Sequence, residues 1–219
     1  ATSSKGPAKS PWPMFGQNAQ RTGRASATPN SPEAAAAIEA AIRKAAGKPT
    51  GELTQADLEK VTRLELPNKE ITDLNPLKSL VNLDILLLDH NKITDLTPLA
   101  NLKNLTQLGI DFNQITDLTP LSAMKKMEQI WLGDNQITEL SPLSSMTGLK
   151  LLFISNNPDL TKDEIDKLQK ALPKCKITPS PTFEPVGMIQ SHDPINNFYV
   201  IDVGSDNGIN IGDKFTIVR

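Results

Sequence analysis

Two adjacent stretches of the chain, residues 83–104 and 105–126, decide its fold. The first is LDILLLDHNKITDLTPLANLKN and the second is LTQLGIDFNQITDLTPLSAMKK, so the same apolar, Asn and Pro positions return after 22 residues. The step extends in both directions, and its members include Asn91, Asn113, Asn135, Asn157, Ile71, Ile93, Ile115, Ile137, Leu74, Leu96, Leu118 and Leu140. Each repeat can bury its apolar side chains only against a neighbouring copy, so the sequence predicts a solenoid of stacked coils.

The positions within one repeat have separate physical roles. Alternating apolar residues such as Leu86 and Leu88 predict a short strand with one face in the core. The Asn that follows stands where the chain turns, and its amide can bind backbone groups of the buried turn in a ladder. A capping residue and Pro then predict a short helical turn at Asn75-Pro76, Thr97-Pro98, Thr119-Pro120 and Ser141-Pro142. This pattern is the leucine-rich-repeat signature, and the predicted fold class is an α/β leucine-rich-repeat solenoid.

The repeat resembles those of a known group of bacterial proteins. The segment Ile93-Thr94-Asp95-Leu96-Thr97-Pro98-Leu99, with its 22-residue step, resembles the repeats of the internalins and of the related phosphatase-regulator type. The stretches 38–43 and 53–58 resemble the helical leader before such repeats in bacterial surface proteins. The likeness covers roughly residues 33 to 178. It implies non-enzymatic protein binding on the concave face, by a secreted or cell-envelope protein, and it does not identify the partner.

Helix signals precede the first repeat. Ser31, Pro32 and Glu33 supply an N-cap oxygen, a proline whose missing donor is not needed, and a carboxylate at the positive helix end. We therefore expect a helical N-terminal cap over residues 31–60. The first coil carries Lys69 where the other coils carry Asn, and terminal repeats are commonly atypical because one side faces a cap.

A second cap is expected after the repeats, which we place at residues 61–160. Thr161 and Glu164 have the spacing of a capping box, which predicts a helical C-terminal cap over residues 161–178. The single cysteine, Cys175, falls within this cap. We interpret it as a core residue rather than a reactive thiol, because no His lies close to it in sequence.

The two ends of the chain differ from the repeats in composition. Residues 1–30 are predicted to be a flexible tail, because their basic and Pro-rich composition cannot bury enough apolar surface to offset the entropy of ordering. Within this tail, residues 12–16 (WPMFG) resemble the opening strand of bacterial quinoprotein-like propellers. The chain is too short for a propeller, so we expect Trp12 and Phe15 to pack onto the neighbouring domain.

Beyond the C-terminal cap, residues 179–185 are predicted to be a Pro-rich linker. Residues 186–219 follow as a small β module whose strands are expected at 186–189, 198–203 and 214–218. The module faintly resembles small β-barrels of bacterial envelope and flagellar-assembly proteins. It is too short for an independent core, so we expect it to dock on the solenoid, on a partner or on further sequence.

Composition and motifs exclude several functions. The charge is nearly balanced, with 23 Lys+Arg against 25 Asp+Glu, so no globally basic nucleic-acid binder is expected. No run approaches the ~20 apolar residues of a membrane span. No catalytic triad, phosphate loop, dinucleotide glycine motif or metal-ligand spacing is present, and we expect neither an enzyme nor a cofactor. His192 and Asp193 are expected in a hairpin loop of the small β module.

The candidate site is on the concave face of the predicted sheet. Its outward strand positions include apolar residues that the core does not need, and we predict partner contacts at Ile85, Leu87, Gly109, Trp131, Leu151 and Phe153. Gly109, between Leu87 and Trp131, is expected to leave a notch for a partner side chain. In the alternative, the tail or the C-terminal module folds back and covers this patch.

Two further readings of the sequence remain open. In one, the solenoid is a spacer that presents the β module; in the other, Trp131 and Phe153 stack on the sugar rings of a carbohydrate or peptidoglycan. Beside His90, the carboxylates of Asp89, Asp111 and Asp134 recur near the strand ends. Carboxylates are cation ligands, but nothing supplies six well-placed ones here, so we interpret these residues as a solvated surface row.

Overall fold

The computed structural model describes residues 28–178 together with two short strands at 189–193 and 198–201. The chain divides into two units, Ala1–Pro179 and Ser180–Arg219, and each is described here by itself. The first unit contains the repeats and the second contains the two short strands.

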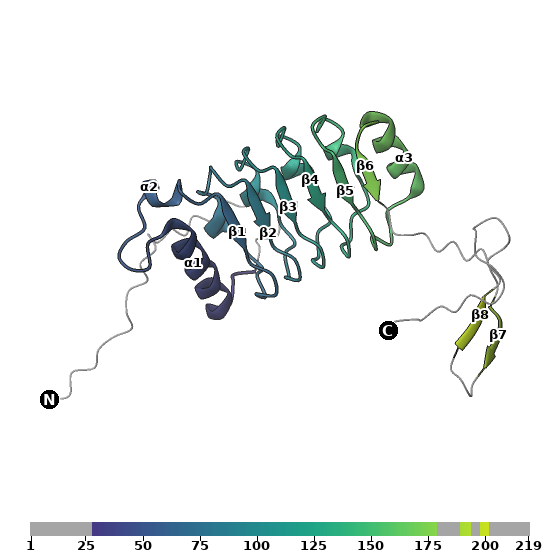
Figure 1. Cartoon of the computed structure of the whole chain (residues 1–219), viewed down its shortest axis with the longest axis horizontal. Helices are drawn as coiled ribbons and strands as arrows, with labels where there is room; N and C mark the ends of the chain where they lie inside the picture. The colour runs from purple at the N-terminus through teal and green to yellow at the C-terminus, as the bar shows by residue number, and fades with distance from the viewer. Residues whose placement is uncertain (1–27, 179–188, 194–197, 202–219) are drawn as a thin grey trace. The chain divides into compact units, whose positions relative to one another are not determined.

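A six-stranded parallel sheet runs the length of the first unit (Figure 1). Its strands follow one another in chain order and are β1 (Arg63–Glu65), β2 (Ile85–Leu87), β3 (Gln107–Gly109), β4 (Gln129–Trp131), β5 (Leu151–Phe153) and β6 (Lys176–Thr178). Each of the first four strands pairs with its counterpart 22 residues later, so that Leu64 faces Leu86, which in turn faces Leu108. This in-register stacking confirms the predicted 22-residue coil.

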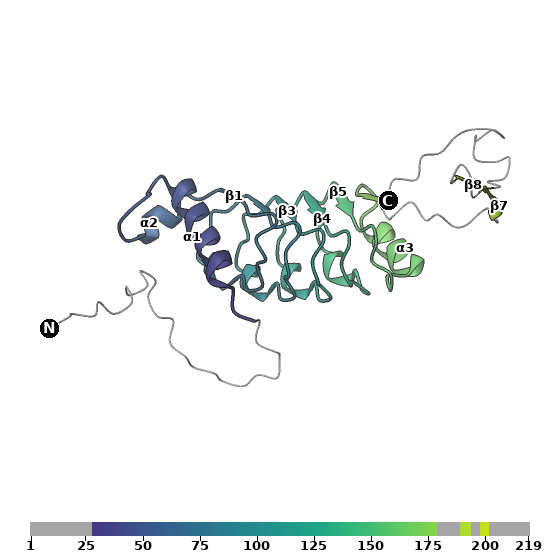
Figure 2. The same cartoon turned by 90° about the horizontal axis from the view of Figure 1, so that it is seen from below.

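The chain returns from each of the first four strands through a 3₁₀-helical turn on the opposite side of the coil (Figure 2). These turns are η1 (Asn75–Leu77), η2 (Thr97–Leu99), η3 (Thr119–Leu121) and η4 (Ser141–Leu143). Pro occupies the second position of every one, where the missing N–H would have no partner in the helix. The predicted helical turns are therefore confirmed, and each is a single 3₁₀ turn.

The space between the sheet and the 3₁₀ turns is filled by one apolar core. The same positions are buried in coil after coil. They are the inward strand residue, the residue after the strand and the repeated Ile and Leu positions. Leu86, Leu88, Ile93, Leu96 and Leu99 show the set for one coil, and all are at most 1 % exposed. Because every coil presents this set to both neighbours, the core is continuous from the first repeat to the last.

The repeated asparagines form the predicted ladder. The Oδ1 of Asn113 accepts a hydrogen bond from the N–H of Ile93 in the preceding coil at 3.0 Å. Its Nδ2 donates to the backbone oxygens of Leu88 in that coil and of Ile110 in its own, each at 3.1 Å. Asn91, Asn135 and Asn157 repeat this arrangement, and all four side chains are buried. The ladder thus satisfies turn groups that water cannot reach.

Two helices, α1 (Pro32–Ala46) and α2 (Gln55–Leu58), precede the first strand. The Ser31 hydroxyl caps α1 by accepting from the N–H of Ala34, and Ile38 and Ile42 are buried against the first coil. Gly47 ends α1 in the left-handed conformation at φ 67°, which costs a glycine little. In Figure 1, α1 lies beside β1 at one end of the sheet.

Asn30 lies inside the described part of the chain and is bound to the first coil. Its Oδ1 accepts from the N–H groups of Thr72 and Asp73, and its Nδ2 donates to the backbone oxygen of Asp73 at 2.7 Å. Asn30 was predicted to belong to the flexible tail, because one polar residue carries no periodic signal. Residues 1–27 of the predicted tail, including Trp12 and Phe15, lie outside the described residues.

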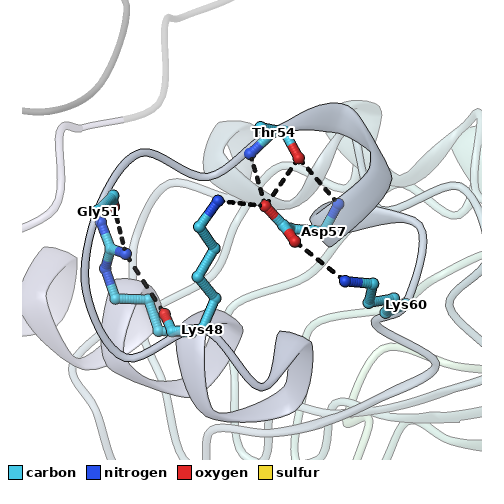
Figure 3. A network of polar contacts seen from close by, with 6 residues as sticks. Lys48, Gly51, Thr54, Asp57 and Lys60 are labelled. Carbon is cyan, nitrogen blue, oxygen red and sulfur yellow. Dashed lines mark hydrogen bonds and ion pairs between the residues drawn. The ribbon is translucent and has the colours of Figure 1, made fainter.

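A polar network closes the loop between the two helices (Figure 3). The Asp57 carboxylate lies between the ammonium groups of Lys48 at 2.7 Å and Lys60 at 3.1 Å. It also accepts from the backbone and hydroxyl of Thr54, while the Thr54 hydroxyl accepts from the Asp57 N–H, which completes a capping box. The hydrogen bond from Lys48, followed by those from Thr54, holds the pKa of Asp57 far below its ordinary value.

The far end of the sheet is covered by α3 (Lys162–Ala171) and by β6. The Thr161 hydroxyl accepts from the N–H of Glu164, so one half of the expected capping box is present. Cys175 is buried with Leu168 and Leu172, as predicted, and burial raises the pKa of its thiol. The β6 strand was not predicted, because three residues are too few to show a period.

The second unit contains an antiparallel pair, β7 (Ile189–Asp193) and β8 (Phe198–Ile201). His192 pairs with Tyr199 within this pair, so the expectation that His192 and Asp193 occupy a hairpin loop was wrong. Pro194, Asn196 and Asn197 follow directly, and Pro and Asn are common turn residues, so the turn signal continues beyond Asp193. The predicted linker at 179–185 and the third strand at 214–218 lie outside the described residues.

Candidate functional site

The outward strand side chains form two columns on the sheet, together called the sheet face. One column is Arg63, Ile85, Gln107, Gln129 and Leu151, and the other is Glu65, Leu87, Gly109, Trp131 and Phe153. The observed register aligns both columns as the sequence predicted. All six predicted contact residues therefore lie on one face of one sheet.

The apolar members of the sheet face are half-buried rather than fully exposed, and they form two groups. Ile85 and Leu87 lie on β2, whereas Trp131, Leu151 and Phe153 lie on β4 and β5. The Trp131 and Phe153 rings are stacked, with centroids 6.2 Å apart and planes 8° apart. Each ring covers part of the other, which explains how aromatic side chains outside the core are half-shielded from water.

The notch expected at Gly109 is not present. Gly109 is buried, and a Cβ atom added to it would lie 2.9 Å from Cδ2 of Leu87 and 3.0 Å from Oδ1 of Asp89. The neighbouring coil has therefore filled the space that the missing side chain leaves. The prediction of a notch was wrong because it treated the column as isolated, whereas longer side chains lean into an empty neighbouring position.

A row of carboxylates continues the sheet face beyond the strand ends. Oδ1 of Asp89 accepts from the N–H of Asp111 at 3.1 Å, and Oδ1 of Asp111 accepts in the same way from the N–H of Gly133. A Cβ atom at Gly133 would lie 3.1 Å from Oδ1 of Asp111, so Gly at this position gives the carboxylate room. We call Asp89 and Asp111 the carboxylate row.

The environment of Asp111 opposes its negative charge. The side chain is half-buried, and this loss of water is the main cause that raises its pKa to about 6. The Gly133 hydrogen bond and the nearby His90 act in the opposite direction, while the charges of Asp89 and Asp134 raise the pKa further. Asp111 thus changes charge at mildly acidic pH, which the sequence did not indicate.

A third column of residues lies next to the carboxylate row, and its member Phe112 was not identified from the sequence. The residue before each ladder position has a left-handed backbone, at Asn68, His90, Phe112, Asp134 and Asn156, with φ from 52° to 56°. The Phe112 ring is 47 % exposed and stacks on the His90 ring, with centroids 4.1 Å apart and planes 8° apart. The available signal was an aromatic residue at a repeat position that otherwise carries polar residues.

Two features are absent from the described residues, a metal-binding cluster and a membrane-spanning helix. Across residues 28–178 and the two strands of the second unit, no group of three or more His, Cys, Asp or Glu side chains is placed to hold a metal ion. Within the same residues, no helix has both the length and the apolar character required to cross a membrane.

The fold and the face define a class of protein. Residues 81–123 match the family model described as Leucine Rich repeats (2 copies), and the flanking coils repeat the same geometry. The chain is therefore built from leucine-rich repeats. Its fold is similar to that of an internalin (inlF) of Listeria monocytogenes, with a TM-score of 0.60 at 28 % sequence identity.

The match to this internalin covers 65 % of the present chain and 42 % of the Listeria protein, so the chain spans less than half of that structure. Internalin C2 (inlC2) of Listeria monocytogenes is 25 % identical, covering 72 % of this chain and 99 % of that one, with a TM-score of 0.49. A leucine-rich-repeat protein of Leptospira interrogans is 23 % identical, covering 56 % and 38 %, with a TM-score of 0.42. No curated protein matches the chain significantly.

Proposed function

We propose that the sheet face binds another protein and that the chain works as a recognition module rather than an enzyme. An internalin-like leucine-rich-repeat solenoid is consistent with protein–protein recognition in general. The observation that carries the proposal is the group of Trp131, Leu151 and Phe153 side chains, which project from β4 and β5 away from a core that is already complete. Clustered aromatic and aliphatic side chains outside a core typically mark an interface.

The proposed contact residues are Ile85, Leu87, Gly109, Trp131, Leu151 and Phe153. Gly109 has a different role from the one expected, since Leu87 already fills the space beside it. We propose that Gly109 keeps the middle of the face low, so that a partner can contact the β2 group and the β4–β5 group together.

The test compares Trp131→Ala with Lys103→Glu, an exposed residue outside the sheet. Both variants and the wild-type chain serve as bait for proteins from cell extracts, and captured partners are then titrated by calorimetry. We expect Trp131→Ala to weaken partner binding by ~2 kcal/mol or more, the scale of an interface hot spot. Lys103→Glu should leave the affinity unchanged. A partner that binds the Trp131→Ala variant at wild-type strength would contradict the proposal.

Carbohydrate binding is a second candidate, because aromatic rings outside a core, such as those of Trp131 and Phe153, can stack on sugar rings. A glycan array and a peptidoglycan pull-down, each with wild type and Trp131→Ala, distinguish the two. Glycan binding that depends on Trp131, without protein capture, would favour this candidate. If neither ligand class binds, the solenoid is better described as a spacer for the C-terminal β module.

We also propose that the protein acts in the envelope or outside the cell of a bacterium. The support is the internalin-like character of the repeats. Immunoblots of cytosol, envelope and medium fractions from the source bacterium test this, and a purely cytosolic signal would contradict it.

A further inference from the structure

The Phe112 ring lies outside the core, so the packing of the fold does not require it. The side chain is 47 % exposed, contributes nothing to the buried core and is stacked on His90. Together with the neighbouring carboxylates it forms a surface that we call the turn edge, made of Asp89, His90, Asp111, Phe112 and Asp134.

The backbone at Phe112 is unfavourable for this residue type. Its φ is 54°, in the left-handed region that bulky side chains rarely adopt. The equivalent positions in other coils carry Asn68, His90, Asp134 and Asn156, and Asn, Asp and His are the residue types enriched in this conformation. A strained and exposed aromatic residue is more easily explained by a contact with a partner than by the needs of the fold.

Among the described residues, the carboxylates of the turn edge are bound by neutral groups. Asp89 and Asp111 accept hydrogen bonds from backbone N–H groups, and Oδ1 of Asp134 accepts one from the Asn156 amide at 3.0 Å. These donors are neutral. Within residues 28–178, none of the three carboxylates forms an ion pair with Lys or Arg, whereas nine such pairs occur elsewhere in that range.

The turn edge is continuous with the sheet face. Trp131 at the end of β4 pairs with Gly109 at the end of β3. Two residues beyond these strand ends, the N–H of Gly133 donates to Oδ1 of Asp111. Neighbouring strands are ~4.8 Å apart and residues along a strand ~3.3 Å apart, so Asp111 lies roughly 8 Å from Trp131 along the surface. An extended partner chain spans that distance in about three residues.

We propose that the turn edge binds an Arg or Lys side chain of an extended partner segment whose apolar side chains cover Trp131 and Phe153. This inference rests on the proposed protein-binding function and adds the chemistry of the partner. The carboxylates receive the cationic head, and the exposed Phe112 ring packs against the aliphatic stem, a pairing that joins charge complementarity with apolar contact. The recognised element is a basic residue about three positions from an aliphatic or aromatic one.

The test uses the full chain and a display library of random dodecapeptides as the probe. Selection on the wild type should enrich peptides with Arg or Lys about three positions from an apolar residue. Synthetic copies of the enriched peptides are then titrated against Asp111→Asn, which removes the charge and keeps an oxygen that can accept from Gly133. The affinity should fall about tenfold, the scale of one charge-assisted hydrogen bond. Phe112→Asn, which installs the residue found in other coils, should also weaken binding.

Asp95→Asn is the matched control, because its carboxylate likewise accepts a backbone N–H bond but lies on the side of the 3₁₀ turns. It should bind the peptides as the wild type does. Peptides that lose affinity to Trp131→Ala but show no basic preference and bind Asp111→Asn normally would overturn this inference and leave the proposed function standing. If Trp131→Ala binds as well as the wild type, the proposed function fails as well.

The pH dependence supplies a second readout. Asp111 has a pKa raised to about 6, so acidification below that value removes one charge from the turn edge and should weaken peptide binding. Asp89, Asp134 and His90 are the charged or titratable groups that act on it, and they stay unchanged in Asp111→Asn. The variant should therefore show a flatter affinity profile between neutral pH and pH ~5. Identical profiles for the two proteins would contradict a role for Asp111.

Discussion

Asn113 and Asp111 are two residues apart in one turn, and their side chains differ in how well the protein satisfies them. The Asn113 amide is buried with a partner for its oxygen and several for its nitrogen, all uncharged. The Asp111 carboxylate is half-buried, has one backbone donor, and lies near two further carboxylates. The Asn113 side chain therefore stabilises the fold, whereas no Lys or Arg of residues 28–178 forms an ion pair with the Asp111 carboxylate.

The largest effect is expected at the ladder. Asn113→Ala leaves the buried N–H of Ile93 without its acceptor, whereas the oxygen of Leu88 keeps its hydrogen bond from Asn91. A buried donor left unsatisfied costs ~1–3 kcal/mol, so we expect the free energy of unfolding to fall toward the upper end of that range. Urea unfolding followed by circular dichroism measures this, and Gln114→Ala, an exposed neighbour, serves as control. Equal midpoints for the two variants would mean that the ladder does not hold the coils together.

A smaller loss of stability is expected at Gly109. In Gly109→Ala the new Cβ meets Leu87 and Asp89 at about 3 Å, and both side chains must move. Overpacking of this kind costs typically ~1–3 kcal/mol, and we expect the lower end because the clashing atoms are the ends of side chains. A thermal melt measures the change. An unchanged melting temperature would restore the open notch that the sequence suggested.

The smallest effect has the opposite sign. The folded chain raises the Asp111 pKa from 3.8 to about 6, so the charged form is destabilising at neutral pH. Asp111→Asn should therefore raise the free energy of unfolding, by on the order of 1 kcal/mol once solvent screening is allowed for. The same substitution is expected to weaken peptide binding. Loss of stability on this change would indicate a structural carboxylate and would break the contrast with Asn113.

The pH dependence of stability distinguishes the Asp111 carboxylate, which opposes folding when charged, from the Asp57 carboxylate, which favours folding when charged. Because the folded pKa of Asp111 is raised, its contribution to stability declines as the pH rises between 3.8 and about 6. Asp57 has a lowered folded pKa, so its contribution is present above its unfolded pKa and is lost as the pH falls. Chemical denaturation across mildly acidic pH should show a flatter decline toward neutrality for Asp111→Asn. Asp57→Asn should lose stability mainly above its ordinary pKa.

The repeat made most of the fold predictable, because each coil restates the same positions. A single period predicted the four ladder asparagines, the Pro of each turn and the inward strand residues. Non-periodic contacts did not follow from it, such as the bond between Asn30 and Thr72 or the three-residue strand that ends at Thr178. These depend on chain segments meeting in space, and no local pattern records them.

The sequence predicted which residues make up the sheet face but not the shape of that face. Register alone placed Trp131 beside Phe153, since residues 22 apart share a column. The closed space at Gly109 arises because Leu87 and Asp89 lean across the coil boundary, which depends on rotamers rather than on spacing. Phe112 was passed over because the sequence does not show which repeat position carries a left-handed backbone.

The asparagine ladder also gives the solenoid a polarity and makes its length adjustable. Every ladder asparagine binds backbone groups of the preceding coil. Asn135, for example, accepts from the N–H of Ile115 and donates to the oxygen of Ile110. An in-frame excision of residues 94–115 would join Ile93 to Thr116 and present Asn135 with Ile93 and Leu88, which offer the same backbone groups. A shortened chain of this kind would keep its ladder, its core and both ends while losing Gly109, Asp111 and Phe112. Recognition in this architecture can therefore be gained or lost one module at a time without redesigning the fold.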